Sequence, residues 1–283
     1  MFGLFLDFTN KYAQDRGVMF SRFFKPAHLI DETSVQWMFD TFSWAMKNFD
    51  ADVFFNKSIL VTPSNEHFPG NESSAEGMAR LIFDRVKTYA GMQHWPCRLV
   101  DASTVDVNAI PQIQVQLEGS ARSVTEVAAP PVDDSKKLVI LYQKESLRDP
   151  EVLIANFAHT LAHYLGTTAT EAPPGGEENW PHVTELLAVF MGFGVMMADS
   201  ANTAKIRSCS SCSGPAVERE NFLSEYDITY ALAIFCSLKD IPTGQVVKEL
   251  KSSLRPFYKR AVKDVTSRKS QLLQLKEFQQ QNH

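Results

Sequence analysis

The sequence predicts an α+β fold, in which a mixed β-sheet precedes a helical half built around a buried central helix. KLVILYQ (137–143) has the apolar composition of a buried strand, and IQVQL (113–117) alternates as a strand with one wet face does. LLAVFMGFGVMMA (186–198) runs for thirteen residues without a charge, which is typical of a helix buried on all sides. We therefore expect one domain, 1–283, with a sheet-containing half (1–147) and a helical half (148–283).

The sheet-containing half has five further local signals. Apolar and aromatic residues at helical spacing predict a helix over 34–49, and KSILV (57–61) before Thr-Pro predicts a short strand. A second helix is expected over 73–91, with Ser73 and Glu76 as a capping box and Gly91 as its end. Residues 97–100 read as another strand, and the Pro/Ala/Asp-rich stretch 119–135 reads as a long loop.

The helical half opens with the clearest boundaries in the chain. Asp149 is a typical N-cap, Pro150 suits the first helical position, and Gly166 ends the pattern. A loop rich in turn formers (166–180) leads to the apolar helix, expected over 181–198. Residues 223–239 predict another helix, with Ser224 as N-cap, and the chain from Pro242 onward is expected to be helical with a break near Pro256.

Three side chains of this half suggest a metal site. His159 and His163 are four residues apart, so a helix places both imidazoles on one face. Glu185 precedes the uncharged run, and a buried carboxylate is costly unless a positive group meets it. We therefore expect His159, His163 and Glu185 to bind Zn²⁺, since three protein ligands with an open fourth position are usual for catalytic zinc. A salt bridge from Glu185 to a lysine or a protonated histidine is the alternative.

The residues around this triad bear on catalysis. In the metallopeptidase motif HExxH a glutamate next to the first histidine activates the metal-bound water, but this chain reads HTLAH, with Thr160 in that place. His182 lies one turn before Glu185 and could act as a substitute base, a ligand or a supporting donor. The loop glutamates Glu171, Glu177 and Glu178 are further candidates for a base.

HTLAH followed by TELLAVFMGFGVMMADSA (184–201) resembles the zincin metallopeptidases whose third zinc ligand is a Glu or Asp on the following helix. It is most similar to a family of uncharacterised bacterial cytosolic proteins that pair HExxH with T-D or T-E before an apolar helix. LVTPSNEHFPG (60–70) and 223–239 extend the resemblance. It implies a zincin-like fold, a zinc ligated by His159, His163 and Glu185, and a general base at position 160, where this chain departs from the family.

These observations favour a zinc-binding, degenerate metallopeptidase (a pseudoenzyme) that binds a peptide or protein partner, for example by strand addition beside the metal helix. The alternatives are an active metallopeptidase with a base other than position 160, and a metal-free interaction module that uses the basic C-terminal helix. The sequence does not indicate a substrate or an oligomeric state.

Charge and cysteine content bound the partners and the compartment. From Gln245 onward the net charge is +6, against −11 for the rest; we interpret this as the solvated face of an amphipathic helix, so nucleic acid is an unlikely partner. Four cysteines do not form a disulfide framework, and Cys209 and Cys212 are expected to be free thiols or a local disulfide. With no signal peptide or membrane span expected, the predicted location is the cytoplasm.

Overall fold

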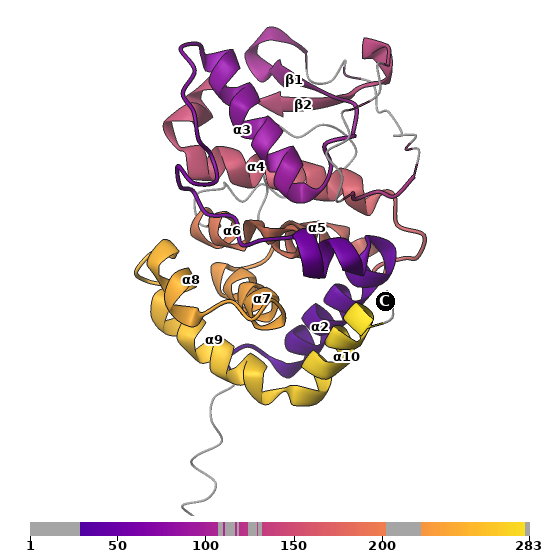
Figure 1. The fold of residues 1–283 in the computed structure, drawn as a ribbon, viewed down its shortest axis with the longest axis vertical. Helices are drawn as coiled ribbons and strands as arrows, with labels where there is room; N and C mark the ends of the chain where they lie inside the picture. The colour runs from indigo at the N-terminus through magenta and orange to yellow at the C-terminus, as the bar shows by residue number, and fades with distance from the viewer. Residues whose placement is uncertain are drawn as a thin grey trace, which may run out of the picture.

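The computed structural model describes residues 29–106, 110, 117, 119–123, 129, 132–201 and 222–280. Its elements are stacked in layers (Figure 1). The two strands and α3 lie at one end, α4 lies beneath them, and the α5–α6 segment forms the next layer. α7 follows, with α8 beside it and α9 on its far side. The fold is α+β, as expected, and most of the described residues are helical.

The α-helices are α2 (Glu32–Asn48), α3 (Ala75–Ala90), α4 (Pro150–Gly166), α5 (Trp180–Ala188), α6 (Gly194–Asp199), α7 (Glu225–Leu238), α8 (Thr243–Glu249), α9 (Arg255–Ser267) and α10 (Lys269–Gln280). The strands are β1 (Cys97–Asp101) and β2 (Leu138–Tyr142). Two π-helical turns, η1 (Val53–Lys57) and η7 (Val189–Phe193), and 3-10 turns at Ala102–Thr104, Asp134–Lys136, Lys144–Arg148 and Glu177–Asn179 complete the described elements.

The strands β1 and β2 pair in parallel, with Cys97 opposite Leu138 and Asp101 opposite Tyr142. Every residue of β2 is buried, which confirms the buried strand expected from its continuous apolar run. The two described strands thus form a parallel pair. Most of the expected strand 113–117 lies outside the described residues. β2 leads through one 3-10 turn into α4, which places the N-terminus of α4 next to the sheet.

The N-terminal helices agree with the sequence except in one cap and one strand. Ser74, rather than Ser73, caps α3, because its hydroxyl accepts the N–H of Gly77 at 2.9 Å; Gly91 ends the helix in a left-handed conformation, as expected. The prediction of a strand over 57–61 is wrong. Val53–Lys57 is a π-helical turn closed by Ser58, and the following backbone makes one bond, from the Val61 N–H to the Gly192 carbonyl at 3.0 Å.

The central helix expected over 181–198 is buried, but it is not continuous. It consists of α5, the π-helical turn η7 and α6, and Gly192 within η7 has a φ of 106°. A β-carbon at Gly192 would lie 2.1 Å from the Ile59 carbonyl oxygen, so glycine is required where residues 59–61 cross the helix. Among the described residues, one stretch, Glu177–Asp199, is long and apolar enough to cross a membrane, yet 89% of its most apolar window is buried inside the protein.

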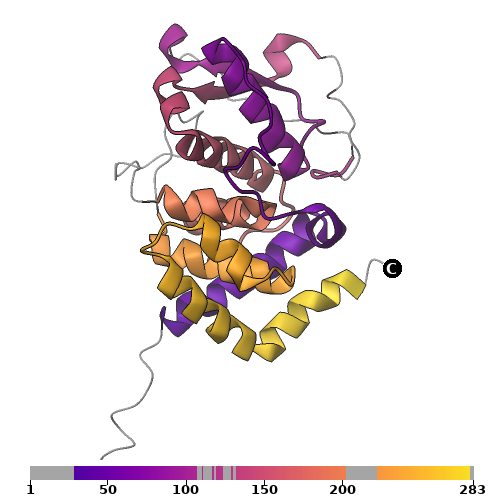
Figure 2. The ribbon, with the colours of Figure 1, turned by 60° about the vertical axis from the view of Figure 1, so that its left-hand side comes forward.

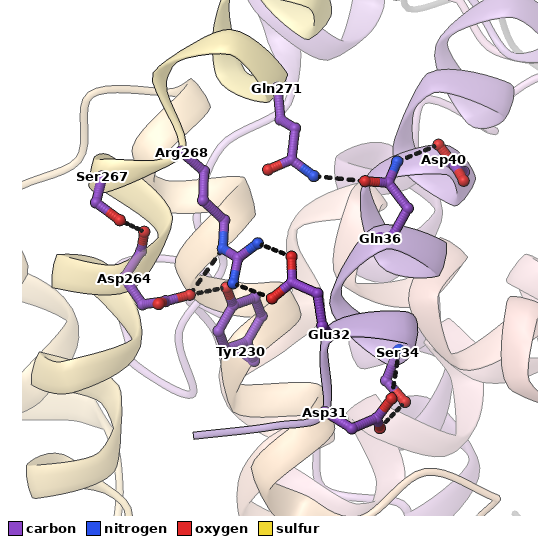
Figure 3. A network of polar contacts seen from close by, with 10 residues as sticks. All are labelled: Asp31, Glu32, Ser34, Gln36, Asp40, Tyr230, Asp264, Ser267, Arg268 and Gln271. Atoms are coloured by element: carbon purple, nitrogen blue, oxygen red, sulfur yellow. Dashed lines mark hydrogen bonds and ion pairs between the residues drawn. The ribbon is translucent and has the colours of Figure 1, made fainter. Parts of the chain in front are cut away.

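The C-terminal region is helical with a break just before Pro256, as expected, and it has a second break at Arg268. Pro256 lies in the first turn of α9, where proline is tolerated, and the chain bends before it at 250–254 and after it at Arg268. Figure 2 shows α10 running away from α9 at a sharp angle. At the bend, Arg268 joins α10 to α2, α7 and α9 through a polar network (Figure 3).

Candidate functional site around helices α4 and α5

Helix α4 carries the histidine pair on a half-buried polar face. The Asp149 carboxylate accepts the Val152 N–H at 3.3 Å and Pro150 occupies the first turn, so the helix begins as expected. Its other side packs into the core, and the half-buried polar residues recur at helical spacing. We call these residues the α4 polar face: Asn156, His159, Thr160, His163 and Tyr164.

Burial sets the electrostatics of this face. Desolvation lowers the pKa of His163, so its neutral, ligand-competent form is favoured at neutral pH. Desolvation likewise raises the pKa of the neighbouring Tyr164 phenol, whose ring lies 5.6 Å from that of His163. His163 and Tyr164 therefore present neutral hydrogen-bonding groups on this face, a character suited to peptide groups.

Thr160 occupies the position of the missing general base. Its hydroxyl donates to the backbone carbonyl of Asn156 at 2.9 Å, one turn earlier in the same helix. A hydroxyl does not act as a proton acceptor at neutral pH as a carboxylate does, and this one has its proton engaged by the helix. Position 160 thus has a local structural role and no basic group.

Glu185 is fully buried in α5. Its Oε2 atom accepts the backbone N–H of Leu223 at 2.7 Å and that of Phe222 at 3.3 Å. These two residues immediately precede Ser224, the N-cap of α7. The Glu185 carboxylate therefore fixes the entry of the chain into α7 through charge-assisted hydrogen bonds, an arrangement that the sequence pattern did not reveal.

His182 lies in an aromatic setting. Its ring meets Trp37 edge-on at 6.3 Å and Phe222 at 5.7 Å, and its Nδ1 atom is buried with no hydrogen-bond partner among the described residues. Desolvation lowers the pKa of His182, while the charge of Asp227 opposes that shift. His182 and Glu185 both contact the residues that lead into α7.

The three expected zinc ligands lie on two neighbouring helices. His159 and His163 come from α4 and Glu185 from α5, and these two helices pack directly on each other. Among the described residues, however, no group of three or more His, Cys, Asp and Glu side chains is arranged to hold a metal ion. The zinc site therefore stays a prediction, and in this structure the Glu185 carboxylate binds backbone N–H groups.

The loop between α4 and α5 is attached to α2 rather than to the α4 polar face. The indole N–H of Trp37 donates to the Pro174 carbonyl at 2.9 Å, and that of Trp44 donates to the Glu171 carbonyl at 3.0 Å. The Asn48 side-chain oxygen accepts both the N–H and the hydroxyl of Thr170, at 3.0 and 3.1 Å. Glu171, Glu177 and Glu178, the candidate loop bases, are all exposed.

Cys209 and Cys212 lie outside the described residues, whereas Cys97 and Cys236 are free thiols. Burial raises the pKa of Cys97 to about 11 and that of Cys236 to about 12, so both are unreactive thiols at neutral pH. No family model matches the chain, and neither the curated proteins nor the solved structures include one that is significantly similar to it.

Proposed function

We propose that this protein is a zincin-like scaffold that no longer hydrolyses peptide bonds and that binds a peptide or protein partner on the α4 polar face. The observation that carries the proposal is Thr160, whose hydroxyl is hydrogen-bonded to Asn156 at the position where a peptidase needs a carboxylate. Losing a general base typically costs about 10²- to 10⁴-fold in rate. Binding is then the function that the site can still perform.

The order of the elements supports a zincin-like scaffold by analogy. A helix (α3), two strands, the histidine helix (α4) and the glutamate helix (α5) follow one another along the chain. This support is at the level of the fold, and function belongs to the site. At the site, the hydrogen-bonding side chains of the α4 polar face suit contacts with peptide groups.

Zinc-dependent function is the competing proposal, and the observation that favours it is the i, i+4 pair His159 and His163 on one half-buried face. It requires the Glu185 carboxylate to exchange the N–H groups of Phe222 and Leu223 for the metal. Zinc would then supply a Lewis acid at this face. Such an exchange would weaken the entry into α7, so metal binding and the stability of α7 would be coupled.

The first test compares cleavage and metal content. Purified protein from zinc-supplemented growth is expected to hold less than about 0.1 equivalent of zinc and to leave an unfolded test protein intact. Thr160→Glu is expected to remain inactive, because Glu185 is engaged with the backbone. Chelator-sensitive cleavage by the natural chain would establish the active-peptidase alternative, and one equivalent of zinc would establish the zinc-binding one.

The second test addresses binding. Random-sequence decapeptides, measured by fluorescence polarisation, are expected to bind the natural chain, and Thr160→Arg is expected to weaken binding by about tenfold, because a long cation fills the α4 polar face. Arg98→Lys, a conservative change at an exposed position of β1, is the matched control and should have no effect. Equal binding by natural chain and Thr160→Arg would place the binding surface elsewhere.

A further inference from the structure

Helix α9 has an outer face that no other described element covers. Its inner side packs on α7 through buried residues, namely Phe257, Tyr258, Ala261 and Val265. Both ribbon views place α9 at the edge of the molecule, with α7 between it and the α5–α6 segment (Figures 1 and 2). The outer side chains are therefore exposed within the described part of the chain.

The outer face is basic. Lys259, Arg260 and Lys263 are exposed on α9, and Lys269 is exposed just beyond it; we call these four residues the basic face. Of the other cations in the C-terminal region, Lys251 pairs with Glu225, Arg268 with Glu32 and Asp264, and Lys276 with Asp240, whereas Arg255 donates to backbone carbonyls and Lys248 has no ion pair among the described residues. Within the described residues, no ion pair involves the basic face.

An aromatic edge adjoins the basic face. Tyr226, in the first turn of α7, is 46% exposed, one of the few large hydrophobic residues that are exposed in the described chain. Its ring lies 4.9 Å from the ring of Phe257, and the Arg260 guanidinium lies 5.9 Å from the same ring. Tyrosine and arginine packed on a buried aromatic ring form the composition that is enriched at protein–protein interfaces and that a merely solvated charged face lacks.

The chemistry of the surface favours an acidic protein segment over other polyanions. The whole chain has a net charge of −5, so a long polyanion such as DNA would be repelled beyond the few turns of α9. The exposed uncharged residues on the outer side of α9 are Pro256, Thr266 and Ser267, and the aromatic side chain of Tyr226 lies at its edge, so among the described residues this surface lacks the row of large apolar side chains that inserts into a bilayer. A short acidic segment matches the length of the basic face and can place an apolar side chain on Tyr226.

We propose that the basic face, with Tyr226 at its edge, is a docking surface for an acidic protein segment that carries at least one aromatic or large apolar residue. The cations attract and orient the acidic segment, and the Tyr226 ring supplies the apolar contact. This surface is formed by α7 and α9, so it is independent of the α4 polar face.

The experiment uses the full chain and a labelled peptide of about twenty residues, half of them glutamate, with two phenylalanines. At about 0.05 M salt the natural chain is expected to bind it, and the double variant Lys259→Glu/Lys263→Glu should lose at least about tenfold in affinity. Lys47→Glu/Lys136→Glu changes the net charge equally at two other exposed lysines and should change the affinity less than about twofold. Tyr226→Ser should lose about threefold or more.

Three outcomes would overturn the proposal. The first is no binding of this peptide by the natural chain. The second is an equal loss in both double variants, which would show that net charge alone is responsible. The third is tighter binding of a duplex DNA or of phosphatidylserine vesicles with the same dependence on Lys259 and Lys263, which would assign the surface to nucleic acid or membrane.

Discussion

Single side chains decide what chemistry the α4–α5 region can perform. Thr160 donates to its own helix, and Glu185 accepts the N–H groups of Phe222 and Leu223. Both interactions have a structural role in the helices that carry them. A buried carboxylate needs compensation from a positive or hydrogen-bonding partner, and here backbone N–H groups supply part of it.

Asp199 provides a pH test at this scale. It ends α6 and accepts the Lys251 N–H at 3.1 and 3.2 Å, and burial, aided by the nearby Glu151, raises its pKa from 3.8 to about 6. Because the folded-state pKa exceeds the unfolded one, the contribution of Asp199 to stability is full below about pH 4 and is lost as the pH rises through about 6. The charged form therefore costs stability at neutral pH.

Asp199→Asn is expected to raise the melting temperature at about pH 7.5 by a few degrees and to reduce the difference between about pH 5 and pH 7.5. The amide oxygen can still accept the Lys251 N–H, so the change removes the charge and keeps the bond. Thermal unfolding by circular dichroism at both pH values measures this, with the exposed Asp40→Asn as control. A lower melting temperature at pH 7.5 with unchanged pH dependence would contradict the assignment.

The two π-helical turns form one structural unit in the core. Phe54 of η1 and Phe190 of η7 stack with their ring centroids 4.6 Å apart. Lys239 lies 5.7 Å from the Phe54 ring and donates to the carbonyls of Phe54 and Phe55, while the buried Arg122 lies 5.4 Å from the Phe190 ring and donates to the Ala90 carbonyl at 2.9 Å. Lys239 thus binds carbonyls within η1, and Arg122 binds the last carbonyl of α3.

Gly192→Ala tests the crossing of residues 59–61 over η7. A β-carbon would meet the Ile59 oxygen at 2.1 Å, and a φ of 106° strains any L side chain. Together these effects should lower the free energy of unfolding by about 2–5 kcal/mol. Urea unfolding measures it. Gly244→Ala in α8 is the matched control, because its β-carbon meets nothing within 4 Å, and it should be neutral or slightly stabilising. Equal stability of both variants would contradict the crossing.

Across the molecule, the polar network around Arg268 connects the N-terminal helix α2 to the C-terminal helices (Figure 3). The Arg268 guanidinium binds Glu32 of α2 through two bonds of 2.5 and 2.8 Å, and its Nε donates to Asp264 of α9 at 2.9 Å. Tyr230 of α7 donates to the same Asp264 carboxylate, and burial raises the pKa of that phenol. Arg268, at the bend between α9 and α10, therefore links the first described helix, α2, to α7, α9 and α10.

Arg268→Lys keeps the charge but loses the two-pronged contact with Glu32. We expect a loss of about 1–2 kcal/mol in unfolding free energy and faster hydrogen exchange in α10 and the first turn of α2. Arg80→Lys is the control: Arg80 pairs with Glu76 at 2.9 Å, but both are largely exposed, so the change should have no measurable effect. Unchanged exchange in α10 in the Arg268→Lys variant would show that other contacts hold this helix.

Prediction from the sequence was most accurate where the signals are local. Asp149 and Pro150 correctly place the start of α4, and Ser224 with Asp227 forms the capping box that begins α7. These signals work because a cap satisfies N–H groups within three residues of itself. The buried strand β2 and the burial of the central helix followed from composition in the same way.

Prediction was wrong or incomplete where distant segments meet. The run 57–61 has strand-like composition, but no described strand pairs with it: the Ser58 N–H closes η1, and the Val61 N–H donates to Gly192 in a distant helix. The attachment of the 167–179 loop to Trp37 and Trp44 was likewise not predicted, since it joins residues more than 120 positions apart. Nothing in a local window specifies such partners.

From residue order alone follow the start and end of most helices, the buried character of β2 and the central helix, and the absence of a glutamate at position 160. The three-dimensional packing decided the rest: the break at Gly192, the placement of Glu185 against the entry to α7 and the closure around Arg268. Local hydrogen bonding and burial depend on nearby residue types. The partner of a buried charge instead depends on which distant backbone atoms the folded chain brings to it.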